Sequence, residues 1–379
     1  MTRGNDPSTV GIFLGAIGSL LPWRGEPGFP THAGDMTLDA VRRLTGRTDL
    51  TRVEPVYEHH GTALHLRLRL TGGPGCPETV FVKLAPVKPI TRLFNNAMNL
   101  AGNEADIYRR IGPELGDIVP HIFGAASDPG SGRAVIIMED LAARGAQFGN
   151  VADGCTTDQA AAVAEVLGTL HSRFHRSPRL ERGGDLSFVT TPTPPAQVLG
   201  PYTWRTIRSV PDDYTDLVPD GFLAKAAFIN TRRREVAALI ESSSDTLIHG
   251  DTHLGNICFV DNRPVFFDWQ VSSKGPGLKD LTYFASLSLN TADRRAVDKD
   301  LVQIYGEAFN AGGERALTFD EAWHNYRLFT FIGFIGAVFT ANLGRRLQEV
   351  NTTRASLSRA IAALDDLETL ELLQRRLDS

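Results

Sequence analysis

The sequence predicts an α+β protein with a smaller, β-rich N-terminal part and a larger, mainly helical C-terminal part. Short apolar runs of strand length dominate up to about residue 141, interrupted by one amphipathic helix. Helical periodicity prevails from Thr157 onward, over residues 159–174, 221–242 and 291–377. A chain of 379 residues is long enough for two such parts, each with its own core. We therefore expect an extension over residues 1–36, a small lobe over 37–141 and a large lobe over 142–379.

The N-terminal extension contains an apolar run, Val10 to Leu21, that resembles the core of a signal peptide. Three glycines interrupt this run, and it is shorter than the roughly 20 residues that a membrane span needs. We expect it to pack against the rest of the protein instead of acting as a signal. Thr37 is then expected to cap a short helix over residues 38–44.

The segment from Thr246 to Asp268 predicts a short strand, a polar loop and a β-hairpin. The loop reads HGDTHLGN from His249, and the Asx-containing turn at 261–264 separates two β-rich runs. Antiparallel pairing would bring Asn256, at the entry of one strand, close to Asp268, at the exit of the other. Carboxylate and amide oxygens suit Mg²⁺, and Asp251 on the loop would face them as a catalytic base. The alternative is a polar hairpin whose turn residues are satisfied locally.

The loop also matches the H-x-D-x-x-x-x-N catalytic-loop pattern of kinases. Together, HGDTHLGN, the FFDWQ that contains Asp268 and the DLTYF that begins at Asp280 resemble the aminoglycoside and choline phosphotransferase superfamily. The D-[FW]-Q and D-L-x-Y-F patterns make its ecdysteroid kinase-like branch the most similar one. The resemblance implies a protein-kinase-like, two-lobed fold, an ATP- and Mg²⁺-dependent reaction and a small-molecule substrate with a hydroxyl group.

A kinase also needs a cation for the nucleotide phosphates and a carboxylate to hold that cation. Lys83 ends the apolar run 79–84, and only Lys88, in a proline-flanked stretch, is another lysine before residue 225. Glu104 shares a predicted helix face with Ile107 and Tyr108, where an unpaired carboxylate would be costly. We therefore expect Lys83 and Glu104 to pair. An edge-strand lysine and a first-turn glutamate favoured by the helix dipole are the alternatives.

Two further segments are candidates for nucleotide binding. The turn between the strands 51–57 and 64–70 contains Gly61 and Thr62, whose amides could approach phosphate oxygens. It could equally be an ordinary hairpin turn. The apolar strand from Ala134 ends in the stretch that a kinase-like fold would use to read adenine through its backbone, namely Glu139, Asp140 and Leu141.

The substrate is expected to be a small hydroxylated molecule. Candidates for its binding pocket are the aromatic residues Trp204, Trp269 and Trp323. The pocket expected around these residues is not conspicuously acidic, which favours an apolar alcohol over a polycationic aminoglycoside as the substrate. The sequence has Asp-Trp-Gln in place of Asp-Phe-Gly and lacks a downstream Ala-Pro-Glu, which argues against a protein kinase. A non-catalytic binding protein that kept the fold is the remaining alternative.

Composition adds limits on partners and compartment. The net charge of −5 at pH 7 gives no basic surface for nucleic acid, and no membrane partner is expected. The three cysteines are scattered and lack metal-ligand spacing, which favours reduced thiols in a cytoplasm. ATP is the expected donor, although GTP would fit the same motifs, and the sequence does not indicate an oligomeric state.

Overall fold

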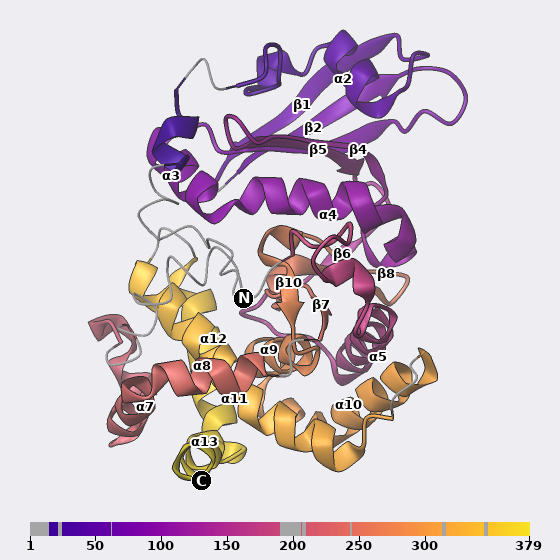
Figure 1. Cartoon of the computed structure of the whole chain (residues 1–379). Helices are drawn as coiled ribbons and strands as arrows, with labels where there is room; N and C mark the ends of the chain where they lie inside the picture. Colours follow the sequence, from indigo (N-terminus) through magenta and orange to yellow (C-terminus); the bar gives the residue numbers. More distant parts are fainter. Residues whose placement is uncertain are drawn as a thin grey trace. The chain divides into compact units, whose positions relative to one another are not determined.

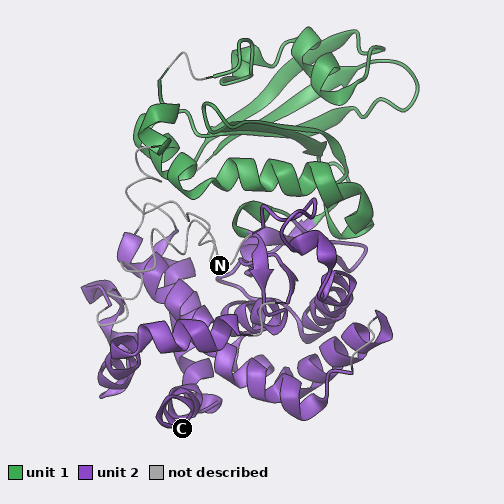
Figure 2. Cartoon of the chain, in the orientation of Figure 1, with its two compact units in different colours: residues 1–146, 194–198, 267–271 green, residues 147–193, 199–266, 272–379 purple. Residues whose placement is uncertain are grey.

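A computed structural model describes residues 15–21, 25–61, 63–189, 206, 210–242, 245–312, 316–344 and 348–379. Within these residues the chain forms two compact units (Figure 2). Unit 1 holds the residues up to Ala146 together with Phe267–Val271. Unit 2 holds most of the remaining chain from Gln147. The chain therefore passes between the units near residue 146, five residues beyond the lobe boundary expected from the sequence, and the short segment that contains Asp268 belongs with unit 1.

Unit 1 is built on one antiparallel sheet with the strand order β1-β2-β3-β5-β4 (Figure 1). Its strands are β1 (Arg52–His60), β2 (Leu64–Thr71), β3 (Thr79–Leu84), β4 (Ile122–Asp128) and β5 (Arg133–Glu139). Alternation along β2 sends Leu64, Leu66, Leu68 and Leu70 into one core, where they meet Val80 and Val82 of β3. The residues that alternate with them, including Lys83, lie on the opposite face.

Two helices, not the single one predicted, lie between β3 and β4. Lys88 lies in the loop after β3, and α3 (Pro89–Met98) follows it directly, with Pro89 at its first position. Proline is favoured there because its missing N–H would have no partner in the helix. Asn99, in the left-handed region at φ 51°, ends α3 and begins α4 (Leu100–Leu115), which packs on β4. The predicted helix 38–44 forms α2 (Leu38–Thr45), where Thr37 accepts a hydrogen bond from Ala40 N.

The described end of the N-terminal extension, residues 15–21, lies against α3. Ala16 is buried, and the Asn96 side chain donates a 2.7 Å hydrogen bond to Ser19 Oγ. The Arg92 guanidinium donates to the Ser19 carbonyl as well. This part of the predicted apolar run is thus held to unit 1 by polar contacts.

Unit 2 contains the predicted hairpin, formed by β8 (Ile257–Val260) and β9 (Arg263–Phe266), with β6 (Gln147–Phe148) on the other side of β8. Asp261 and Asn262 both have positive φ, 50° and 61°, as a two-residue type I′ turn requires. The turn is therefore shorter than expected, and Pro264 lies within β9. Proline is tolerated in this strand because β9 is at the edge of its sheet.

The rest of unit 2 is mainly helical. The strand predicted before the catalytic loop is β7 (Thr246–Ile248), which pairs with β10 (Ser273–Gly275). Its described helices are α5 (Thr157–Phe174), α7 (Phe222–Thr231), α8 (Arg233–Glu241), α9 (Leu278–Ser288), α10 (Thr291–Gly312), α11 (Phe319–Leu343), α12 (Val350–Asp366) and α13 (Thr369–Asp378). Of the described helices, α11 alone is long and apolar enough to cross a membrane, and it packs here on α9 and α12.

The type I′ turn yields a stability prediction. Replacing Asn262 with valine places a β-branched side chain in the left-handed region, so we expect a loss of about 1–2 kcal/mol in the free energy of unfolding. Arg263→Val is the matched control, because Arg263 is also exposed but lies in a strand, where valine is favoured. Urea unfolding of both variants tests this, and equal stabilities would contradict the turn assignment.

Candidate active site

In unit 1, Lys83 lies between two carboxylates. Its Nζ is 2.6 Å from Glu104 Oε2 and 2.9 Å from Asp268 Oδ1. The Glu104 side chain is 1 % exposed and that of Lys83 is 13 % exposed, while Asp268 is more open at 27 %. The structure thus brings together three of the predicted site residues. Asp106, the next carboxylate of α4, pairs instead with Arg109.

The charges of this triad depend on one another. Burial acts to lower the pKa of Lys83, but Asp268 and Glu104 outweigh it, so the pKa is raised and the ammonium stays charged. Burial raises the pKa of Glu104 to about 7, against the opposing effect of Lys83. Removing either carboxylate would leave a buried charge short of a partner, which makes the triad sensitive to substitution.

Asp268 is held by its neighbours in the chain and in α4. Its φ of 65° lies in the left-handed region, which aspartate tolerates better than most residues. Asn103 of α4 donates a 3.0 Å hydrogen bond to the Gln270 carbonyl, just beyond Asp268. Trp269 is completely buried beside it. Its indole therefore packs inside the protein and presents no surface to a substrate, contrary to its suggested role.

The sheet face that carries Lys83 also carries a row of rings that the sequence did not single out. His65 of β2 lies directly opposite Lys83 of β3. Its ring centroid is 5.5 Å from that of Phe81 and 6.4 Å from that of His59. Burial, followed by the nearby charge of Lys83, lowers the pKa of His65 to about 4. The alternating pattern of β2 shows that His65 avoids the leucine core, but only the register of β2 with β3 places it beside Lys83.

The two nucleotide-binding segments predicted for unit 1 are placed differently. Gly61 lies in the turn between β1 and β2 and donates to the Ala63 carbonyl at 2.9 Å, whereas Thr62 is outside the described residues. Glu139 ends β5. The Asp140 carboxylate is turned inward, where it pairs with Arg67 at 2.7 Å and accepts a 2.9 Å hydrogen bond from Thr79. Leu141, which is also buried, follows it.

In unit 2, Asp251 is surrounded by groups that favour its charged form. Asn256 Nδ2 donates both to the Asp251 carbonyl, at 2.9 Å, and to Asp251 Oδ2, at 3.1 Å. His253 Nε2 lies 3.5 Å from the same carboxylate oxygen, and Tyr283 hydrogen-bonds to this carboxylate. Burial acts to raise the pKa of Asp251, but His253, His249 and Tyr283 outweigh it and lower the pKa to about 2. The carboxylate is therefore ionised at neutral pH, as an acceptor of a substrate proton must be.

The backbone before Asp251 is fixed by Asp280. The Asp280 carboxylate, completely buried, accepts hydrogen bonds from His249 N at 2.7 Å and Gly250 N at 2.9 Å. Gly250 has a φ of 87°, which a side chain would strain. His171 completes the arrangement, with Nε2 3.3 Å from Asp280 and Nδ1 3.0 Å from the Tyr305 hydroxyl. His171 is thus a satisfied core histidine.

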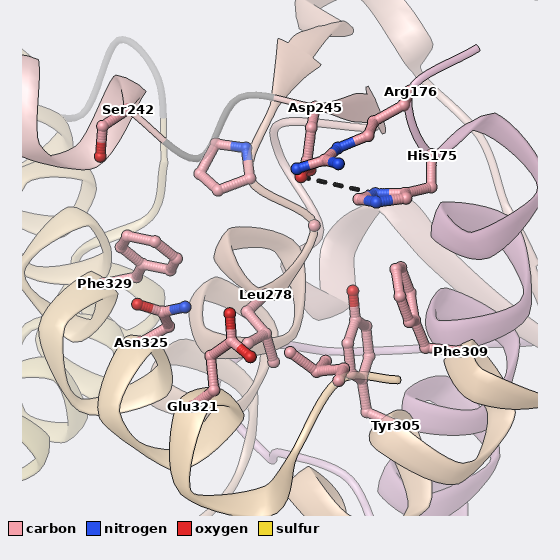
Figure 3. Close-up of a pocket in the computed structure, with 13 residues that line it drawn as sticks. His175, Arg176, Ser242, Asp245, Leu278, Tyr305, Phe309, Glu321, Asn325 and Phe329 are labelled. Carbon is pink, nitrogen blue, oxygen red and sulfur yellow. Dashed lines mark ion pairs between the residues drawn. The ribbon is translucent and has the colours of Figure 1, made fainter. Parts of the chain in front are cut away.

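Tyr305 also lines a cavity of about 170 Å³ in unit 2 (Figure 3). The labelled side chains around it include the aromatic Phe309 and Phe329 and the acidic Glu321. At its edge, His175 Nδ1 lies 3.5 Å from the Asp245 carboxylate. Neither Trp269 nor Trp323, the two described tryptophans among the substrate candidates, lines this cavity.

The other two candidate tryptophans are Trp204 and Trp323. Trp204 lies outside the described residues. Trp323 of α11 stacks on Phe319 and Tyr326, with Lys299 Nζ 5.9 Å from its ring centroid. Its ring is engaged in packing between α10 and α11, so it remains only a weak candidate.

A family model described as the phosphotransferase enzyme family matches residues 71–328, which is more than half of the chain. The chain belongs to this family. The aminoglycoside and choline phosphotransferase resemblance found in the motifs is thereby confirmed, and so is the enzyme class, a small-molecule kinase. A search of curated proteins finds no match.

Solved structures of kinases share the fold. A choline kinase from Cryptosporidium parvum Iowa II is 11 % identical with a TM-score of 0.53, covering 86 % of this chain and 91 % of the other. The amicoumacin kinase hAmiN, in complex with AMP-PNP, Ca²⁺ and Ami, is 13 % identical with a TM-score of 0.51, covering 88 % and 94 %. The expected protein-kinase-like α+β fold, with a small β-rich and a larger helical part, is confirmed.

The lowered pKa of His65 predicts acid sensitivity. Between pH 6.5 and about 4 the unfolded chain binds a proton at this imidazole and the folded protein does not, so the free energy of unfolding falls as the pH falls. His65→Gln should therefore lose less stability than the parent protein between pH 7 and 5, as measured by denaturant unfolding. His60→Gln, at the exposed end of the same hairpin, is the control and should keep the parent's acid sensitivity. An unchanged pH dependence in His65→Gln would contradict the placement of this ring.

Proposed function

We propose that this protein transfers the γ-phosphoryl group of ATP to a hydroxyl group of a small molecule, with Mg²⁺ as the cofactor. The observation that carries the proposal is the part-buried Lys83, paired with Glu104 and Asp268. A charged lysine fixed by a helix carboxylate is what the nucleotide phosphates need for positioning. An ordinary edge-strand lysine would point to solvent, and Lys83 does not.

The solved kinases that share the fold support this donor and this class of acceptor. One is named as a choline kinase, and the other holds the ATP analogue AMP-PNP with a divalent cation and Ami. Both names refer to small-molecule acceptors. We infer a similar reaction here, with ATP rather than GTP as the donor and the cytoplasm as the compartment.

The residues proposed for the metal have suitable oxygen atoms. The side-chain nitrogen of Asn256 is used by Asp251, which leaves its amide oxygen for a cation. Asp268 offers the carboxylate oxygen that does not face Lys83. In the described part of the chain no three or more His, Cys, Asp or Glu side chains cluster as a metal site. This fits Mg²⁺, which commonly takes one or two protein ligands and completes its shell with phosphate oxygens and water. When bound, Mg²⁺ would neutralise charge on the phosphates.

Asp251 is the proposed base. Its ionised carboxylate accepts a hydrogen bond from the acceptor hydroxyl and takes the proton late in the transfer. Asn256, His253 and the backbone ties to Asp280 orient it. On the nucleotide side, Lys83 positions the phosphates, the backbone near Glu139–Leu141 reads the adenine, and Gly61 lies in the turn that approaches the phosphates.

Single substitutions separate these roles. Asp251→Ala should lower kcat by at least about 10²-fold, as expected for a lost general base, while Mg-ATP binding persists. Asp268→Ala should instead weaken Mg-ATP binding, measured by isothermal titration calorimetry. Asp300→Ala, which removes an exposed aspartate of α10, is the control. Full transfer activity in both site variants would refute the assignment.

A further inference from the structure

One side of α9 faces the proposed base Asp251 with two residues that have no role in the proposed function so far, Lys279 and Tyr283. They are four positions apart and therefore lie on the same face of the helix. Neither is fully buried, whereas their neighbours Asp280, Leu281 and Thr282 are. What this face implies about the acceptor rests on the proposed function.

Tyr283 is fixed in place from two sides. Its hydroxyl hydrogen-bonds to the Asp251 carboxylate. Behind it, α11 approaches at Gly336, where an added Cβ would lie 2.7 Å from the Tyr283 hydroxyl and 2.9 Å from its ring. Glycine at this position makes room for the tyrosine. The phenol is thus held against the base by close packing, not merely located near it.

Lys279 places a positive charge on the same face, one helical turn before Tyr283. Its charge interacts with Asp280, Asp251 and Glu241. Asp280 is already used by two backbone N–H groups and by His171, and no ion pair within 4 Å joins Lys279 to any described carboxylate. Burial lowers the pKa of Lys279, which shows that its ammonium group is partly removed from water. Its charge therefore acts strongly on whatever lies next to Asp251.

The local balance of charge disfavours a cation at this place. A cationic acceptor would need carboxylates around it, as well as the one that takes its proton. Besides Asp251 and Asp280, Glu241 is the carboxylate in the described part of unit 2 whose charge interacts with Lys279. The charge that acts on Glu241 is in turn that of Lys279. An ammonium group beside the reacting hydroxyl would meet the like charge of Lys279.

We propose that Lys279 and Tyr283 form the acceptor-side wall of the active site and select acceptors that carry no positive charge near the reacting hydroxyl. Tyr283 is a positioning residue that orients Asp251, and Lys279 determines specificity. In the reaction, the acceptor oxygen forms a bond to the γ-phosphorus as the bond to the β,γ-bridging oxygen breaks. ADP leaves with that electron pair, and the acceptor proton passes to Asp251. Acceptors of the choline type are thus excluded by charge, although the fold is shared with a choline kinase.

The test of specificity is a mass-shift screen with ATP, Mg²⁺ and three pools of hydroxylated compounds: cationic amino alcohols, neutral alcohols and hydroxy acids. We expect products that gain one phosphate from the neutral or acidic pools. Lys279→Gln should lower the ratio of kcat/KM for these acceptors over choline or ethanolamine by about tenfold or more, the effect of one removed like charge. Lys299→Gln, which removes an exposed lysine of α10, should leave the ratio unchanged.

The possible outcomes distinguish a failure of the proposed acceptor specificity from a failure of the proposed kinase function. Transfer to cationic acceptors in preference to the other pools would overturn the specificity while leaving the kinase function intact. An unchanged ratio in Lys279→Gln would overturn the role of Lys279 in the same way. The absence of any phosphorylated product from all three pools would overturn the proposed function and this inference together.

The positioning role of Tyr283 has its own test. Tyr283→Phe should lower kcat about tenfold, in line with the loss of one hydrogen bond to a charged group, with the KM for Mg-ATP unchanged. Tyr326→Phe is the matched control, because Tyr326 also donates to a carboxylate, Asp298, at 2.6 Å, but away from the site. It should lower the melting temperature and leave kcat unchanged. Equal kcat values for Tyr283→Phe and the parent protein would overturn the role.

Discussion

The pairing of Lys83 with Glu104 is the interaction on which unit 1 depends. An ammonium group and a carboxylate are both withdrawn from water at this point, and each is tolerable only because the other is present. Breaking such a pair typically costs about 3–5 kcal/mol, since one charge is left buried without a partner. This requirement holds β3 against α4, and through Asp268 it also holds the Phe267–Val271 segment. The chemistry proposed for Lys83 and the packing of this unit therefore share one contact.

Asp280 plays the corresponding part in unit 2. No lysine or arginine of the described residues forms an ion pair with its carboxylate, which is stabilised instead by backbone N–H groups and by His171. These bonds fix the peptide units just before Asp251, so that the orientation of the base follows from a residue buried in the next helix. Arg359 acts in a similar way at a distance, since its guanidinium donates to the carbonyls of Val151 and Leu287. In both cases backbone atoms form hydrogen bonds with a buried charged group, and the segments that supply these atoms are fixed in position.

The sequence was most informative where chemistry requires fixed spacing. HGDTHLGN with FFDWQ led to the hairpin, and the face shared by Glu104 and Ile107 led to the pairing with Lys83. It was least informative where the outcome depends on register or close packing between distant segments. His65 lies beside Lys83 because of how β2 pairs with β3, and Tyr283 reaches Asp251 because α11 has a glycine at Gly336. Trp269 looked like a ligand platform because it follows an acid directly, but a large apolar ring is more stable inside the protein. The helix α3 was not predicted, because a proline such as Pro89 can break a helix as well as begin one.

The two-residue turn at Asp261 and Asn262 fixes the number of residues between Asn256 and Asp268. Ile257 pairs with Phe266 and Val260 with Arg263, so every residue from Ile257 to Phe266 is either in the ladder or in the turn, and Phe267 alone separates the hairpin from Asp268. An inserted or deleted residue could not be absorbed there, because a slip by one position would turn the side chains of β9 to the opposite face. Natural variants of this hairpin should therefore differ in residue type but not in the number of residues.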